Sequence, residues 1–127
     1  MKIAFDIGGV LGKYPKIFRP FVCALKSGGA EVYVVTDIPD QATAEQILRG
    51  HGYDFSAENI LCCDYLQHGD CCKRVVIKQF GIDILIDDHP AYCAAAGCVS
   101  LMLWPDASIP YEAPVEYEIR PNQCDMS

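Results

Sequence analysis

Short apolar runs that end in a polar residue constrain the fold of this chain more than any other feature. The first run, residues 2–5, leads into Asp6 and then into a glycine-rich segment that ends at Gly12. A short apolar run predicts a buried strand, and glycines allow a sharp turn directly after it. Because ligands of an open parallel sheet bind beyond the carboxyl ends of its strands, Asp6 is a candidate nucleophile or metal ligand.

The rest of the chain alternates between strand and helix patterns, which is typical of a parallel sheet covered on both faces. The predicted fold class is therefore α/β: a three-layer α/β/α, Rossmann-like fold with a mostly parallel sheet of about five strands. Asp40 and Asp70 are predicted N-caps, and Gly81 is predicted to end the helix that Asp70 begins. The inward side chains of that helix are expected to be Val75, Val76 and Phe80. Helices are expected at 15–27, 41–50, 70–80 and 90–96, and further strands at 31–35, 58–63, 82–86 and 99–103.

The length of 127 residues suits one domain with a sizeable core. We assign residues 1–104 to this domain and residues 105–127 to a C-terminal extension, which is rich in Pro and acidic residues. The extension is expected to pack on the domain or to be partly disordered. Apolar and acidic residues alternate over 115–119, so a hairpin arm or an edge strand is one interpretation and a loose terminus is the other.

The charge balance excludes some classes of partner. A formal net charge of −7 argues against nucleic-acid binding, which requires a basic surface. No apolar run approaches the roughly 18 residues that a membrane helix needs, so no membrane contact is expected. Lys2 leads straight into the first strand without a secretory signal, which favours a cytoplasmic protein.

Eight cysteines are many for this length. Without a secretory signal, reduced thiols are expected rather than a disulfide framework. The pairs at 62–63 and 71–72, with His68 between them, suggest zinc, but adjacent cysteines do not match the C-x₂-C spacing of structural zinc sites. Neighbouring residues on a strand also point to opposite faces. Small buried apolar residues are therefore the preferred interpretation.

Four polar features fall at strand ends or helix starts, namely Asp6, Thr36, Lys73 and the pair Asp87-Asp88. Their order and context resemble the haloacid dehalogenase-like (HAD-like) hydrolase superfamily, in segments 5–10, 34–37 and 80–88, over about residues 2–104. The resemblance implies that Asp6 is the nucleophile and that Thr36 binds the phosphoryl group. It further implies that Lys73 neutralises charge and that the acidic pair holds magnesium. A small capless phosphatase is the expectation.

The chemistry of phosphoryl transfer agrees with this assignment. The reaction needs an in-line nucleophile and positive charge on the equatorial oxygens, and clustered carboxylates repel one another unless a divalent cation lies among them. We therefore expect a Mg²⁺-dependent phosphatase that acts on a small phosphorylated molecule through an aspartyl-phosphate. The expected catalytic residues are Asp6, Thr36 and Lys73; the phosphate-binding residues are Gly8, Gly9, Thr36, Asp37 and Lys73; the metal ligands are Asp6, Gly8 (through its carbonyl), Asp87 and Asp88.

One position departs from the family pattern. Many members carry a second Asp two residues after the nucleophile, which protonates the leaving group, and here that position is Gly8. Three interpretations are open. The substrate carries a leaving group that needs little protonation, or another residue such as Asp37 or His89 supplies the acid, or the site binds phosphate and magnesium without turnover.

Each candidate also has a structural interpretation. Asp6 could cap a turn, Thr36 and Asp37 could form a turn before a proline, and Lys73 could be a solvated lysine. Lys78 competes with Lys73 for the catalytic position, and His89 is expected at the rim of the site.

Loop lengths leave no room for a cap domain between residues 64 and 69, so an open site is expected. A second copy of the chain, a bulky substrate or the extension would then exclude water. There are three rival classes. A receiver domain requires a different order of acidic residues from the one in this chain. A dinucleotide-binding fold requires the spacing G-x-G-x-x-G, which this chain lacks. An interaction module remains open, and it predicts no magnesium affinity.

Overall fold

The computed structural model describes residues 1–104. Five strands form one sheet in the order β3-β2-β1-β4-β5, and every pair of neighbours is parallel. The predicted α/β class is confirmed. The C-terminal extension at 105–127 lies outside the described residues. The strands are β1 (Lys2–Phe5), β2 (Glu31–Thr36), β3 (Ile60–Cys62), β4 (Ile84–Asp87) and β5 (Val99–Met102).

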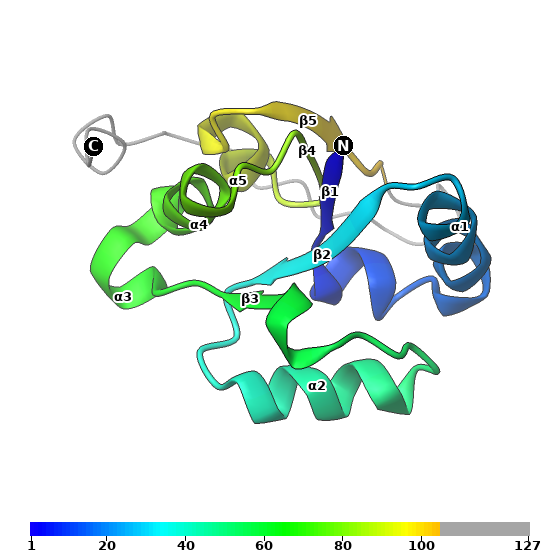
Figure 1. The fold of residues 1–127 in the computed structure, drawn as a ribbon. Helices are drawn as coiled ribbons and strands as arrows, with labels where there is room; N and C mark the ends of the chain where they lie inside the picture. Colours follow the sequence, from blue (N-terminus) through cyan, green and yellow to red (C-terminus); the bar gives the residue numbers. More distant parts are fainter. Residues whose placement is uncertain (105–127) are drawn as a thin grey trace.

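Helices cover both faces of the sheet, so the fold has three layers (Figure 1). Helices α1 (Pro15–Ser27) and α2 (Gln41–Gly50) pack on one face, and α4 (Cys72–Phe80) and α5 (Pro90–Ala95) pack on the other. A single turn, α3 (Tyr65–His68), precedes α4. Side chains of a strand alternate between the two cores, as a period of two requires.

Several helix ends follow the predicted signals. Asp40 accepts a hydrogen bond from the Thr43 backbone N–H at 3.2 Å and begins α2. Gly81 ends α4 with φ of 68°, a left-handed conformation that glycine adopts without a steric penalty. Proline at the first position of α1 is also as expected.

The start of α4 corrects two expectations. Asp70 does not cap this helix: it lies in a 3₁₀ turn, η3 (Gly69–Cys71), and the N-cap is Cys71. The second correction concerns Phe80, which is the last residue of α4 and is 37% exposed. The buried residues of α4 are Cys72, Lys73 and Ile77, and Val76 packs against the same core, as expected. The inward face therefore lies close to the expected one, but it includes a charged residue, Lys73, and its last position is open to solvent.

The structure contains two short elements that the sequence did not predict, one after β1 and one before β3. A π-helical turn, η1 (Ile7–Leu11), follows β1, and the Leu11 N–H donates to the Asp6 carbonyl at 3.2 Å. The Tyr53 hydroxyl donates to the Leu11 carbonyl at 2.8 Å and anchors this turn in the core. A 3₁₀ turn, η2 (Ala57–Asn59), leads into β3. Turn η1 fixes the backbone after Asp6, and the pairing of β1 with β4 fixes the backbone before it.

The cysteines behave mostly as small buried or half-buried residues, and Cys63 and Cys72 belong to the core between the sheet and α4. Cys71 is disulfide-bonded, so the expectation of reduced thiols is wrong at that position. Within residues 1–104, no helix is long and apolar enough to cross a bilayer.

Candidate functional site

The register of β1 and β4 brings the first two acidic residues together. Phe5 pairs with Ile86, so Asp6 and Asp87 follow as the next neighbours at the carboxyl end of the sheet. Ala4 belongs to the core under α4 and α5. Because side chains alternate along a strand, Asp6 faces the same side as Ala4. Both carboxylates are therefore presented to α4.

Lys73 of α4 lies between these two carboxylates. Its Nζ is 2.7 Å from Asp6 Oδ1 and 2.5 Å from Asp87 Oδ2. The lysine side chain is fully buried, the Asp87 side chain is also fully buried, and the Asp6 side chain is 13% exposed. A buried ammonium is tolerated only where it is paired, so this lysine is the fixed counter-ion of the site. Lys78, the competing lysine, is exposed in the last turn of the same helix.

Asp88 completes a group of three carboxylates. Asp6, Asp87 and Asp88 each offer an oxygen, and these oxygens all lie within 4.8 Å of one another. Asp87 is held further by the His89 backbone N–H, which donates to its Oδ1 at 3.0 Å. Hard oxygen ligands in such a cluster fit a divalent cation such as Mg²⁺.

Gly9 makes room for the Asp88 carboxylate. A methyl group placed on Gly9 would lie 1.8 Å from Asp88 Oδ2, closer than any real contact. Any larger residue at this position would force the carboxylate to move. At Gly8 the same methyl group would have a single neighbour, Asp6 Oδ2, at 3.7 Å. Position 8 is therefore open enough to hold a side chain.

Three carboxylates against one ammonium leave an excess of negative charge in this cluster. Burial raises the pKa of Asp87 and the nearby Asp6 carboxylate raises it further, whereas Lys73 lowers it, and the result is about 7. Burial and Asp6 also raise the pKa of Asp88 above its ordinary value. Burial would lower the pKa of Lys73, but Asp6 and Asp87 outweigh it and keep the ammonium charged. The cluster thus favours an added proton or an added cation.

Thr36 and Asp37 lie at the same edge of the sheet, at the end of β2, which neighbours β1. Thr36 is buried, and its hydroxyl accepts a hydrogen bond from the Ile38 N–H at 3.2 Å. Within the described residues no hydrogen bond joins Thr36 to the carboxylate cluster. Asp37 Oδ2 accepts a hydrogen bond from the Tyr92 hydroxyl at 2.9 Å.

Tyr92 of α5 was not predicted to be part of the site. The Lys73 Nζ lies 4.7 Å from the centre of the Tyr92 ring, a cation–π distance. His89 stacks on the same ring with 4.2 Å between ring centres. The apolar spacing of the helix explains why Tyr92 is buried, but the sequence carries no signal that its hydroxyl reaches Asp37, 55 residues away.

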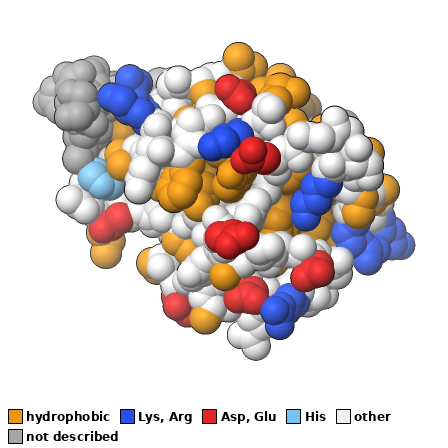
Figure 2. Space-filling model, in the orientation of Figure 1, with side chains coloured by type: hydrophobic (Ala, Val, Ile, Leu, Met, Phe, Trp, Pro, Cys, Tyr) orange, Lys and Arg blue, Asp and Glu red, His pale blue; other side chains and the backbone are white. Residues whose placement is uncertain are grey.

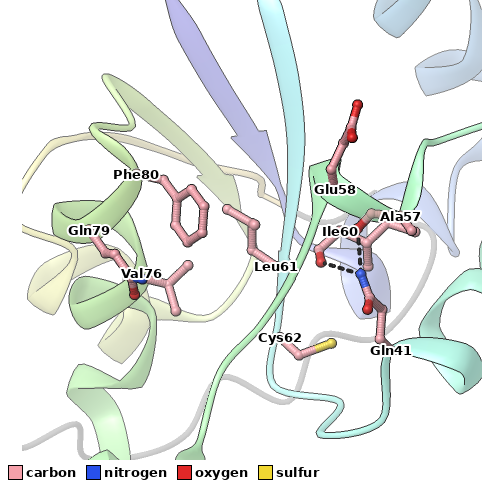
Figure 3. A pocket seen from close by; sticks show the side chains of 9 residues that line it. All are labelled: Gln41, Ala57, Glu58, Ile60, Leu61, Cys62, Val76, Gln79 and Phe80. Carbon is pink, nitrogen blue, oxygen red and sulfur yellow. Dashed lines mark hydrogen bonds between the residues drawn. The ribbon is translucent and has the colours of Figure 1, made fainter.

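An apolar patch away from the carboxylate cluster is a separate surface feature. Figure 2 shows hydrophobic side chains at the surface between α4 and β2. A pocket of about 440 Å³ there is lined by Leu61, Val76 and Phe80, which Figure 3 shows on one side of β3. On the other side of β3, the Gln41 amide donates to the carbonyls of Ala57 and Ile60. This amide covers part of the open sheet edge and limits pairing with another strand.

Comparisons with known proteins do not identify a family. No family model matches the chain, and no curated protein matches it. A solved structure described as a p-nitrophenyl phosphatase from Archaeoglobus fulgidus matches 79% of this chain with 18% sequence identity and a TM-score of 0.42. This chain spans 40% of the length of that protein. A match this weak adds nothing to the functional argument, which depends on the residues of the site alone.

Proposed function

We propose that this protein is a Mg²⁺-dependent phosphatase of the HAD-like type that uses Asp6 as its nucleophile. One observation carries the proposal: three carboxylates from two strand ends offer oxygens within 4.8 Å of one another, and two of them, Asp6 and Asp87, contact a fully buried lysine. Burying such charges is costly, and clusters of buried, perturbed charges are concentrated at binding and catalytic sites. The arrangement lies at the carboxyl edge of a parallel sheet, where α/β folds bind ligands.

The groups that would hold Mg²⁺ are Asp6, Asp88 and the Gly8 carbonyl, and the Asp87 carboxylate lies beside them. The raised pKa values of Asp87 and Asp88 support this assignment, because a cation relieves the same excess of negative charge as a proton does. When bound, the ion supplies positive charge to the phosphoryl oxygens and offsets repulsion between the phosphate and the carboxylates.

The reaction proceeds in two displacements. An Asp6 oxygen attacks phosphorus, a new O–P bond forms, and the bond to the leaving oxygen breaks with its electron pair staying on that oxygen. The leaving oxygen takes a proton from a solvent water and departs as an alcohol. A second water attacks the aspartyl-phosphate and gives a proton to the hydroxide left by the first, which releases inorganic phosphate and regenerates the carboxylate. The sum is one phosphomonoester and one water converted into one alcohol and one phosphate.

Lys73 stabilises the attacking carboxylate in a fixed orientation and carries positive charge towards the transferred group. The backbone N–H groups of Gly8 and Gly9, in the first part of η1, are candidates for binding a phosphoryl oxygen, since the first N–H groups of a helical turn lack partners within it. The Thr36 hydroxyl accepts from Ile38, so its hydrogen is available to donate to another. The Asp37 carboxylate is already oriented by Tyr92, and we assign it to the substrate side of the site.

An open site without a cap domain is part of the proposal. The chain connects β1 to α1 through residues 6–14 and connects β3 to α4 through residues 63–71. Both connections are short, which supports access of solvent to the cluster and a role for a bulky substrate or a second copy of the chain in excluding water.

The test is a panel of small phosphorylated compounds with Mg²⁺, run on the wild-type protein and on Asp6→Asn. We expect turnover that requires Mg²⁺ and that Asp6→Asn abolishes, while Mg²⁺ still stabilises the variant in a thermal scan. Turnover that survives this substitution unchanged would exclude Asp6 as the nucleophile.

The second candidate function is binding of phosphate and Mg²⁺ without turnover. Gly8 favours it, because this position carries no acid to protonate a poor leaving group. The two functions differ with acetyl phosphate, which needs little protonation to leave. Mg²⁺-dependent release of phosphate from acetyl phosphate supports the phosphatase, and tight binding of inorganic phosphate with no release supports the binding protein.

A further inference from the structure

A pocket of about 440 Å³ lies over the carboxyl ends of β2 and β3. Asp37, Ile38 and Pro39 follow β2 and form one side of it, and residues 63–66 follow β3 and form the other. The Cys63 N–H donates to the Thr36 carbonyl at 2.8 Å, which ties the two sides together. Its volume is within the range of small-molecule sites.

This pocket adjoins the carboxylate cluster through one side chain. The Tyr92 hydroxyl donates to Asp37, which lines the pocket, and the face of the Tyr92 ring contacts the Lys73 ammonium. The Tyr65 ring, on the pocket side, meets the Tyr92 ring edge to face with 6.5 Å between centres. Because β2 lies directly beside β1, a ligand whose phosphoryl group lies at Asp6 can extend across the sheet edge into the pocket.

The walls of the pocket define the chemistry of its ligand. Ile38, Pro39 and the aromatic Tyr65 give it an apolar lining, and Leu66 at the rim is 98% exposed. Tyr65 is 48% exposed, so its ring is available for stacking. The charged groups of the lining are the carboxylates of Asp37 and Asp64. Such walls favour a flat apolar ring and repel a second phosphate or a carboxylate.

The Gly8 position supports the same class of ligand independently. A leaving group that departs without help from an acid must be a weak base. A phenolic oxygen meets this requirement better than an alkyl oxygen does, and the phenol ring also matches the apolar pocket.

We propose that the pocket formed by Asp37, Ile38, Pro39 and residues 63–66 binds the leaving group of an aryl phosphate that carries no further negative charge. This inference rests on the phosphatase function proposed above and assigns its substrate class. Asp6 would displace the phenolate from phosphorus, and the phenolate would take its proton from water in the open site.

The first experiment separates ring binding from leaving-group chemistry. Phenyl phosphate and 2-naphthyl phosphate have leaving groups of similar acidity but different apolar area. We expect KM to be about 5- to 10-fold lower for the naphthyl ester, because its extra ring surface is buried. Tyr65→Ala should raise KM for the naphthyl ester by about 5- to 10-fold and change kcat little, since a stacking partner is lost.

Two controls accompany this variant. Acetyl phosphate has a leaving group too small to reach the pocket, so Tyr65→Ala should leave its kinetics unchanged. Ile17→Ala removes an apolar side chain of comparable exposure, 62%, from α1 on the other face of the sheet, and it should leave both aryl esters unchanged. Circular dichroism checks that both variants are folded.

The second experiment tests the charge preference. Asp64→Asn keeps an N-cap for α3, because Asn caps helices as well as Asp does, but removes one negative charge from the pocket. We expect kcat/KM for 4-carboxyphenyl phosphate, relative to phenyl phosphate, to rise by about threefold or more in this variant.

The outcomes distinguish the two proposals. Asp6-dependent turnover of acetyl phosphate with equal KM for phenyl and naphthyl esters overturns the pocket assignment and leaves the phosphatase intact. An equal effect of Tyr65→Ala on acetyl phosphate and on the aryl esters also overturns it. Absence of Asp6-dependent turnover with every substrate overturns the phosphatase, and the pocket assignment falls with it.

Discussion

The buried lysine makes the sharpest prediction about stability. Lys73→Met keeps an unbranched side chain of similar length and removes the ammonium that contacts Asp6 at 2.7 Å and Asp87 at 2.5 Å. Two carboxylates then remain at a buried site without their counter-ion. Removing one partner of a buried pair typically costs about 3–5 kcal/mol. Domains of this size have a total stability of about 5–15 kcal/mol, so the loss is a large fraction of it.

The assay is denaturation by urea followed by circular dichroism at pH 8 in the presence of a chelator. Lys78→Met is the matched control, because it makes the same substitution on the exposed side of the same helix. We expect Lys78→Met to change the free energy of unfolding by at most about 0.5 kcal/mol. Mg²⁺ should restore about 2.7 kcal/mol to Lys73→Met at a concentration of 100 times its Kd.

Two results would refute this reasoning. A cost for Lys73→Met no larger than that for Lys78→Met would mean that the ammonium is not neutralising the carboxylates. A Lys73→Met protein that Mg²⁺ does not stabilise would mean that the three carboxylates do not form a cation site.

Three further predictions concern the glycines and the charge of the site. Gly8→Asp should raise kcat on alkyl phosphates by about 100-fold, with no rise in Gly8→Asn, because the space beside Asp6 Oδ2 admits an acid. Gly9→Ala should weaken Mg²⁺ binding, measured by calorimetry, by about 10- to 100-fold, since it displaces Asp88, whereas Gly50→Ala, with open space around it, should not. Because the pKa of Asp87 is raised to about 7, the metal-free fold loses stability as pH rises from about 4 to 7, and a proton competes with the metal over that window. The increase in Tm caused by Mg²⁺ should thus be larger at pH 8 than at pH 5.5, and equal shifts would contradict the assignment.

The parts of the site that lie on strand ends could be predicted from the sequence. An apolar run indicates where a strand lies, and the polar residue after it must lie at the carboxyl edge of the sheet. The positions of Asp6, Thr36 and Asp87 could therefore be predicted without the tertiary structure. Their approach to one another follows from the strand order, which places β1 between β2 and β4.

The details of α4 were harder to predict. Hydrophobicity alone assigns a lysine to solvent, so the apolar pattern gave no sign that Lys73 is buried, where it pairs with Asp6 and Asp87. The pattern placed Val76 correctly, but Phe80 is the last residue of the helix and is exposed there. The predicted N-cap was wrong for a different reason: Asp70 has the right chemistry, but the 3₁₀ turn at 69–71 delays the start of the helix.

The position of Tyr92 has a consequence for anyone who redesigns this protein. One phenol touches the lysine at the carboxylates, the acid after β2 and the aromatic ring after β3. Replacing Tyr92 would therefore disturb both Asp37 of the leaving-group pocket and the ammonium that contacts Asp6. Specificity and rate are coupled at this one side chain, so libraries that vary the pocket should keep Tyr92 unchanged.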